Sequence, residues 1–295
     1  MITFKGPILR LLIKTKSGNY NALYAILALA GVFSIITSYS ARGTNELNPL
    51  TSSGNLSTYY TLLSPLFVML LFYDVISSKV ADNSLKKILS EPISLRIIRR
   101  HTMSLLISFS LLYAFTLVMP GAILSYFISG EATPDYLLRY IFVAFPTFLY
   151  ILFFASITFL ISVSTSKSSS SILISFFVVA FCYFLWIPMV QLLNVAIIGP
   201  ILGISQNSSV ALSLGNEESY FIPTQDYNNS IAPLGYPSVV GFNLQNLLVY
   251  SFNGVSSSPF RSLELSLIFM IPTFFYIMLL LIAVIWCVSN LKSHY

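Results

Sequence analysis

The sequence predicts an all-α integral membrane protein, and its composition carries this prediction. Hydrophobic residues make up 56% of the 295-residue chain and charged residues only 8%, with a mean hydropathy of +0.82. A soluble domain has about 25% charged residues, so a chain with so few charges has to face lipid over most of its surface. The apolar residues also form long runs. At about 1.5 Å per residue, a run of roughly 20 residues crosses the hydrocarbon core as a helix.

We predict six such helices within a single transmembrane domain, 1–295. Their approximate ranges are 20–39, 58–77, 102–128, 136–163, 172–199 and 263–288. Residues 1–18 have an apolar side flanked by basic residues, which favours a helix in the headgroup plane; a basic leader that only sets orientation is the alternative. Residues 200–262 mix apolar side chains with Ser, Asn, Gly and Pro, which favours an ordered extracellular cap over a disordered loop.

The distribution of charge predicts the orientation of the spans. Twelve of the fifteen Lys and Arg residues fall in segments that six spans place on the side of the N-terminus. An excess of basic residues marks the cytoplasmic side, so we expect a multi-pass protein of the plasma membrane with both termini in the cytoplasm. Three Asn-x-Ser/Thr sequons fall in the predicted outer segments and are candidates for glycosylation. They are Asn55, Asn207 and Asn228.

The segment from Asp74 to His101 is the strongest candidate for contact with a partner, because it contains six of the fifteen basic residues. Within it, Leu85, Ile88 and Leu89 have the i, i+3, i+4 spacing of one helix face. Pro92 ends this short helix. A basic, amphipathic helix between the second and third spans indicates a cytoplasmic loop, 78–101, that another protein holds. The alternative is that its apolar face lies on the headgroups, with its lysines near anionic lipid.

Several kinds of chemistry have no motif in this sequence. There is no G-x-x-x-x-G-K-[ST], and so no P-loop for ATP, and there is no H-E-x-x-H, metal-ligand cluster or G-x-S-x-G. We therefore expect neither catalysis nor a bound cofactor or metal on this chain. The net charge of +5 reflects orientation in the membrane rather than nucleic-acid binding. Cys182 and Cys287 lie in apolar runs and are predicted to be buried and unpaired.

Polar residues inside the predicted spans are few and uncharged. Gln191 and Asn194, near the outer end of the fifth span, either form hydrogen bonds between helices or face a substrate pathway. The span interiors hold essentially no charge, and buried charges are the usual mark of proton and ion pathways. This counts against a secondary transporter or a proton pump. Uncharged, aromatic-rich spans suit a lipidic, glycolipid or hydrophobic peptide cargo.

Short motifs follow one another in the loop between the second and third spans. They are Asp74, Ser84-Leu85, Ile88-Leu89-Ser90, Pro92-Ile93-Ser94 and Arg96. In their order and their position, they resemble the permease subunits of ABC-2 type ATP-binding-cassette exporters. The resemblance covers six spans, an N-terminal interfacial helix, this loop and a longer outer segment before the sixth span. Lys79 stands where that family usually has an acidic residue, which leaves Asp82 to serve, and His101 replaces the usual Lys.

The resemblance implies a mechanism in which two permease chains, identical or closely related, pair to form an export pathway. Each chain would rest a coupling helix on a separate ATPase subunit, which would bind ATP and Mg. In that helix Leu85, Ile88 and Leu89 would fill a groove on the ATPase, while Lys86 and Lys87 would steer the contact. The residues implied in ATPase coupling are Asp82, Ser84, Leu85, Lys86, Lys87, Ile88, Leu89 and Glu91.

Two other function classes stay open at this point. A membrane interaction or assembly protein would use the basic loop to anchor a cytosolic partner without transport. A secondary transporter would move its substrate without an ATPase.

Overall fold

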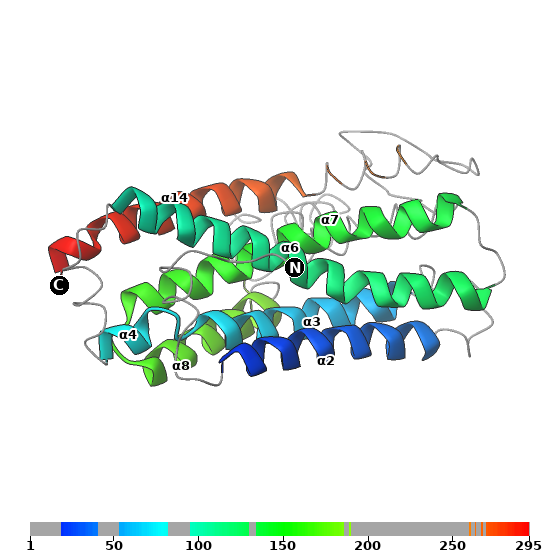
Figure 1. Ribbon diagram of the computed structural model, residues 1–295, viewed down its shortest axis with the longest axis horizontal. Helices are drawn as coiled ribbons and strands as arrows, with labels where there is room; N and C mark the ends of the chain where they lie inside the picture. Colours follow the sequence, from blue (N-terminus) through cyan, green and yellow to red (C-terminus); the bar gives the residue numbers. More distant parts are fainter. Residues whose placement is uncertain are drawn as a thin grey trace, which may run out of the picture.

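The computed structural model describes residues 19–40, 53–81, 95–129, 134–185 and 270–294, together with positions 189, 260, 263 and 267. These residues are helical apart from short turns, and none of them lies in a β-strand. The predicted all-α class is therefore confirmed for this part of the chain (Figure 1). The helices are α2 (Asn19–Ser40), α3 (Ser53–Phe72), α4 (Ser77–Ala81), α6 (Leu95–Ser129), α7 (Pro134–Ser164), α8 (Ser168–Ala180), the π-helical turn η2 (Phe181–Leu185) and α14 (Ile271–His294).

Four stretches of these helices are long and apolar enough to cross a membrane. They are Leu63–Ala81, Arg96–Leu124, Ile141–Ser164 and Ile271–Asn290, in the regions predicted as the second, third, fourth and sixth spans. The predicted first and fifth spans contain the shorter apolar stretches Tyr24–Ile36 and Ser168–Ala180. The protein is thus a multi-pass membrane protein, and the number of six spans stays a prediction.

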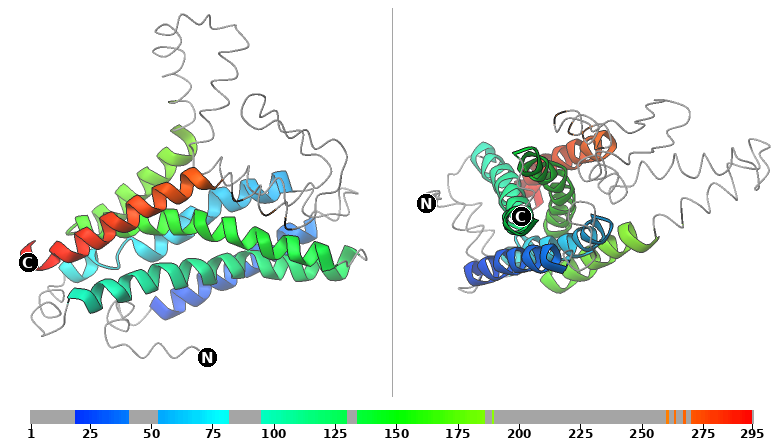
Figure 2. Two further views of the ribbon diagram at one scale, coloured as in Figure 1. Left: turned by 90° about the horizontal axis from the view of Figure 1, so that it is seen from above. Right: turned by 90° about the vertical axis from the view of Figure 1, so that its right-hand side faces the viewer.

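Helix α7 lies at the centre of the bundle, where it packs against α3, α6, α8 and α14. In its apolar stretch 72% of the residues are buried, against 22% in that of α14. Tyr150 and Phe154 of α7 are among the largest fully buried side chains. Their ring centroids lie 5.1 Å apart in an edge-to-face arrangement, which aromatic pairs favour. The right-hand view of Figure 2 shows α7 surrounded by its neighbours.

The long helices alternate in direction, so that distant parts of the chain meet at one end of the bundle. This end, on the left of Figure 1, holds α4, the start of α6, the end of α7, the start of α8 and the C-terminal end of α14. We call it the α4 end. It carries the basic residues Arg96, Arg99 and Arg100 at the start of α6 and Lys167 between α7 and α8.

Helix α2 packs against α6 near Pro120, which lies inside α6. Pro120 has no amide to donate, and its ring disturbs the preceding turn. The next amide, that of Gly121, donates a hydrogen bond of 2.9 Å to Ser34 Oγ on α2. Ser34 is fully buried. Nearby on α2, a Cβ added to Gly31 would lie 3.8 Å from Pro120 Cγ. Helix α2 is therefore hydrogen-bonded to α6 beside Pro120 and lies within van der Waals reach of that proline.

The helix boundaries follow local chemistry. Pro134 is the first residue of α7 and Pro272 the second of α14, and the fixed φ of proline suits the first turn of a helix. Helix α6 begins at Leu95, ahead of the predicted third span, and so takes in the basic residues 96–100. Arg and Leu favour helices, and long basic side chains at the end of a span can reach water.

Candidate functional site

The most distinctive site at the α4 end is a break in the helix that follows α3. Helix α3 ends at Phe72, residues 73–76 form a turn, and α4 begins at Ser77. The turn lies inside the predicted second span, 58–77, and inside the single apolar stretch Leu63–Ala81. At the break, the backbone amides of Ile76 and Ser77 donate their hydrogen bonds to an acceptor outside their own helix. Buried amides need such an acceptor.

The acceptor is a serine from the central helix. Ser162 Oγ on α7 accepts hydrogen bonds from the amides of Ile76 at 3.0 Å and Ser77 at 3.2 Å. Both Ser162 and Ser77 are fully buried. A hydroxyl oxygen has two lone pairs, so one side chain serves both amides. This ties the start of α4 to α7 across 85 and 86 residues of chain.

A second serine fastens the carbonyl side of the same turn. Ser171 Oγ, in the first turn of α8, donates a short hydrogen bond to the carbonyl oxygen of Tyr73. The same carbonyl accepts from Ser77 Oγ at 3.1 Å. Ser171 is fully buried. We call the turn 73–76 with Ser77, Ser162 and Ser171 the serine junction. It joins α3 and α4 to both α7 and α8.

Lys79 on α4 places a charge beside this junction. Its exposed fraction is only 5%, and it interacts electrostatically with the half-buried Asp74. A buried charge is costly unless it is paired. Lys79 was the residue that departed most from the family pattern. Its burial among the helices means that it is not a surface residue of the loop.

The predicted ATPase-coupling residues lie in 82–94, outside the described residues. Helices α4 and α6 bracket that segment, since α4 ends at Ala81 and α6 begins at Leu95. Both ends of the segment therefore start from the α4 end of the bundle (Figure 1). At the start of α6, Arg96 and Arg100 are exposed while Ile98 is buried. The bundle thus presents basic side chains where the segment rejoins it.

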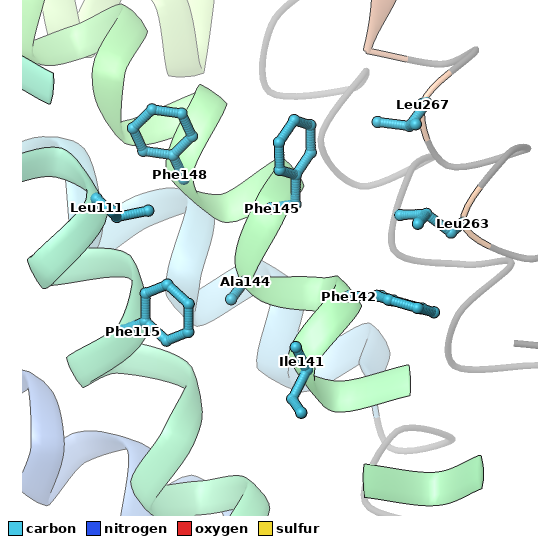
Figure 3. Close-up of a pocket in the computed structure, with 9 residues that line it drawn as sticks. All are labelled: Leu111, Phe115, Ile141, Phe142, Ala144, Phe145, Phe148, Leu263 and Leu267. Carbon is cyan, nitrogen blue, oxygen red and sulfur yellow. The ribbon is translucent and has the colours of Figure 1, made fainter. Parts of the chain in front are cut away.

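A second feature is an apolar pocket of about 350 Å³ between α6, α7 and the positions before α14 (Figure 3). Its lining consists of Leu111, Phe115, Ile141, Phe142, Ala144, Phe145, Phe148, Leu263 and Leu267. The ring of Phe142 also contacts Phe260, with centroids 5.6 Å apart. All nine lining side chains are hydrocarbon. The pocket can therefore hold an apolar group, but these side chains offer no donor, acceptor or charge for chemistry.

The other predicted site residues are mostly beyond the described part of the chain. Gln191, Asn194, Asn207 and Asn228 lie outside it. Asn55 lies in the first turn of α3, although we had placed it in a loop. Whether any of the three sequons is glycosylated stays a prediction.

The cysteines show no sign of metal or disulfide chemistry. Cys182 is buried and Cys287 half-buried, and both are free thiols. Within the described ranges, no three His, Cys, Asp or Glu side chains come together in a way that could hold a metal ion.

Sequence reasoning missed Ser162 and Ser171. Both lie at the margins of apolar runs, in or near the serine-rich stretch between the fourth and fifth spans, where serine reads as ordinary loop composition. Ser162 lies two residues before the end of α7 and Ser171 in the first turn of α8. A serine near the end of a predicted span is common, so this position does not single them out.

Comparison with known proteins connects this architecture to a family. A family model described as ABC-2 family transporter protein matches residues 12–291, nearly the whole chain. A comparison with curated proteins gave no match.

Proposed function

The chain belongs to the ABC-2 family of transporter proteins, and from this premise we propose that it is an export permease driven by an ATPase docked on 82–94. Members of the family are the transmembrane component of an ABC transporter, and a separate subunit hydrolyses ATP. The chain is therefore a membrane permease and not itself the ATPase. The direction of transport and the docking segment are the proposed parts.

The observation that carries the proposal is the position of 82–94. Only 13 residues separate the end of α4 from the start of α6, and both helix ends lie at the α4 end of the bundle. Helix α4 is anchored to α7 and α8 through the serine junction. A protein bound to this short segment would therefore pull on a part of the chain that is bonded directly to the bundle.

Charge supports a cytoplasmic location for the α4 end. Arg96, Arg99, Arg100 and Lys167 all lie there, and basic residues concentrate on the cytoplasmic side of membrane proteins. We propose that both termini are cytoplasmic and that the membrane is the plasma membrane. A cytosolic ATPase would then reach 82–94 from solution.

In the proposed mechanism, ATP and Mg bind to the ATPase subunit and bias the permease between two states. A nucleotide can do this only through contacts that differ between the states. Leu85, Ile88 and Leu89 would fill an apolar groove, with at most about 1.5–3 kcal/mol from full burial of each side chain. Lys86 and Lys87 would orient the encounter and add about 0–1 kcal/mol as exposed pairs. Asp82, Ser84 and Glu91 complete the proposed contact.

Pairing with a second permease chain is also part of the proposal. Large apolar side chains are exposed on α2, α8 and α14, among them Ile36, Leu173, Phe177 and Trp286. Such faces suit lipid as well as a second chain. Cross-linking of the purified complex between engineered cysteines on α2, α8 or α14 would identify the face that pairs.

The apolar pocket supports a cargo with a hydrocarbon part, in line with the lipidic, glycolipid or hydrophobic peptide cargo expected from composition. Ala144 lies in the pocket lining and is itself buried. Ala144→Phe should fill much of the pocket and reduce the amount of lipid that remains with the purified complex, as measured by mass spectrometry. Equal lipid content in both proteins would remove the pocket from the proposal.

The docking proposal is tested by changing the apolar face of 82–94. Leu85→Asp with Leu89→Asp should abolish co-purification of the ATPase from native membranes, because two charges cannot enter an apolar groove without a large desolvation cost. Asn83→Asp is the control, since it adds a negative charge to the same segment at a residue outside the proposed contact. Membrane insertion should be unchanged in both variants. Undiminished association of the double variant would end the docking proposal.

The other two function classes make different predictions for the same preparation. If the chain only anchors a cytosolic protein, the partner recovered with it will lack a P-loop ATPase. If it is a secondary transporter, purified chain alone will transport after reconstitution. The span charges argue against this second class, since the charged side chains of the four apolar stretches lie at the α4 end and not along a pathway.

A further inference from the structure

We infer that Ser162 is a positioning residue that transmits movement of the 82–94 segment to the central helix α7, and that Ser171 does the same for α8. This inference rests on the proposed function, because it assumes that the segment moves when nucleotide binds. It assigns to two serines a role that neither family membership nor sequence pattern provides.

The first step is the geometry of the connection. Helix α4 is five residues long, too short to be stable by its own hydrogen bonds. Its position depends on outside contacts, and its first amide and the one before it both end on Ser162 Oγ. Any displacement of α4 along the bundle either drags α7 or breaks two buried hydrogen bonds.

The second step is what α7 touches. It packs against α3, α6, α8 and α14. A displacement of the end of α7 therefore acts directly on those four helices. Ser171 adds a parallel connection, because α8 is held to the same turn through the carbonyl oxygen of Tyr73. The two serines thus bond different backbone groups of one turn, with the amides bonded to α7 and the carbonyl to α8.

The chain offers a matched control for each serine. Ser156 is also fully buried on α7, but its hydroxyl donates to the carbonyl of Leu152 on its own helix at 2.7 Å. Ser175 is buried on α8 one turn after Ser171, and its hydroxyl has no hydrogen-bond partner in the described part of the chain. Ser156→Ala and Ser175→Ala remove the same atom from the same helices without touching the junction.

The experiment places one spin label in the segment and one far along α7. The complex carries Cys182→Ala and Cys287→Ala, with a single new cysteine at Lys87 or at Ile141, which is exposed. Ile141 lies 21 positions from Ser162, or roughly 30 Å along the helix. The measurement is the change in the spectrum of each label when ATP and vanadate are added to the purified permease–ATPase complex.

In the parent complex both labels should respond. With Ser162→Ala, the label at 87 should still respond, while the change at 141 should fall about fivefold or more, the size of a typical coupling. Ser156→Ala should keep both responses, and Ser162→Thr, which retains the acceptor oxygen, should restore the response at 141. A purely structural role would instead lower both responses together or prevent recovery of the complex.

Ser171→Ala provides an independent reading if Ser162→Ala yields no complex, with a label at the exposed Phe184 position reporting on η2 and Ser175→Ala as its control. An undiminished response at 141 in Ser162→Ala, or at 184 in Ser171→Ala, overturns the inference for that serine and leaves docking intact. Absence of any response at 87 in a parent that also lacks the ATPase overturns the proposed function together with the inference.

Discussion

Two sites in this protein use the same chemistry and have different consequences. Beside Pro120 in α6, Ser34 accepts the amide of Gly121; at the serine junction, Ser162 accepts the amides of Ile76 and Ser77. In both cases a fully buried serine supplies an acceptor to backbone amides outside its own helix. A membrane interior leaves such amides no water to turn to.

The difference lies in what the chain does next. After Pro120, α6 continues as a helix to Ser129, so the Ser34 bond fixes two long helices relative to each other. After the serine junction the helix lasts only five residues and leads into 82–94. The same bond is therefore part of a rigid crossing in one place and a connection to a proposed docking segment in the other. The hydrogen bond alone therefore does not show which of the two sites is connected to the proposed docking segment.

The largest effect on stability should come from the charge that only the serine junction carries. Lys79→Met removes the buried positive charge that interacts with Asp74 and should lower the free energy of unfolding in mixed detergent micelles by at most about 3 kcal/mol. That value is the low end of the range for breaking a buried pair, and solvent at the half-buried Asp74 screens the interaction. Lys79→Met combined with Asp74→Asn should recover most of the loss. A single variant as stable as the parent would show that the charge is not held in the junction.

The next effect separates the two serines by their number of bonds. Interhelical hydrogen bonds in membrane proteins average about 0.6 and reach about 1.7 kcal/mol. Ser162→Ala removes two of them and should cost about 1–3 kcal/mol of unfolding free energy, with Ser156→Ala as the control on the same helix. A cost no larger than that of Ser156→Ala would contradict the double acceptance.

Ser34→Ala removes one interhelical bond and should cost about 0.6–1.7 kcal/mol. It should also leave the nucleotide response of a label at position 87 unchanged, because Gly121 lies 26 residues along α6 from Leu95, where 82–94 rejoins the bundle. This second readout is the sharper one. A loss of that response in Ser34→Ala would erase the proposed distinction between the two sites.

The smallest effect is expected at Gly31. Its added Cβ would lie 3.8 Å from both Pro120 Cγ and Thr116 Cγ2, an ordinary van der Waals separation. Alanine also favours a helix over glycine by about 1 kcal/mol. Gly31→Ala should therefore change unfolding free energy by no more than about 1 kcal/mol, in the stabilising direction. Strong destabilisation would mean that α2 approaches Pro120 and Thr116 of α6 more closely than this.

The class and the order of the helices could be predicted because long apolar runs are a property of sequence alone. Hydropathy placed helical segments at 20–39, 102–128 and 136–163, and the structure has α2, α6 and α7 there. The predicted third span begins at 102, seven residues after the start of α6 at Leu95, because three arginines and a histidine lie within 96–101. Helical propensity and side-chain reach, which hydropathy does not measure, extend α6 over them.

The serine junction could not be predicted, for a physical reason. Residues 73–76 contain neither Pro nor Gly, so no local signal marks a break. The turn is stabilised by Ser162 and Ser171, which lie 85 to 98 positions away. Only the three-dimensional structure shows that Ser162 accepts hydrogen bonds from its amides and that Ser171 donates one to its carbonyl. The pocket is similar, since its lining comes from α6, α7 and positions 263 and 267.

The π-helical turn η2 changes which side of the fifth predicted span its own residues occupy. Along α8 the buried residues Ser171, Ser175 and Val179 follow one another at every fourth position. A π turn takes in one extra residue, and one residue corresponds to about 100° of rotation. A helical wheel drawn from α8 through Phe181–Leu185 would therefore be wrong by about that angle at the end of the turn. Deleting one residue within this turn should remove that extra rotation.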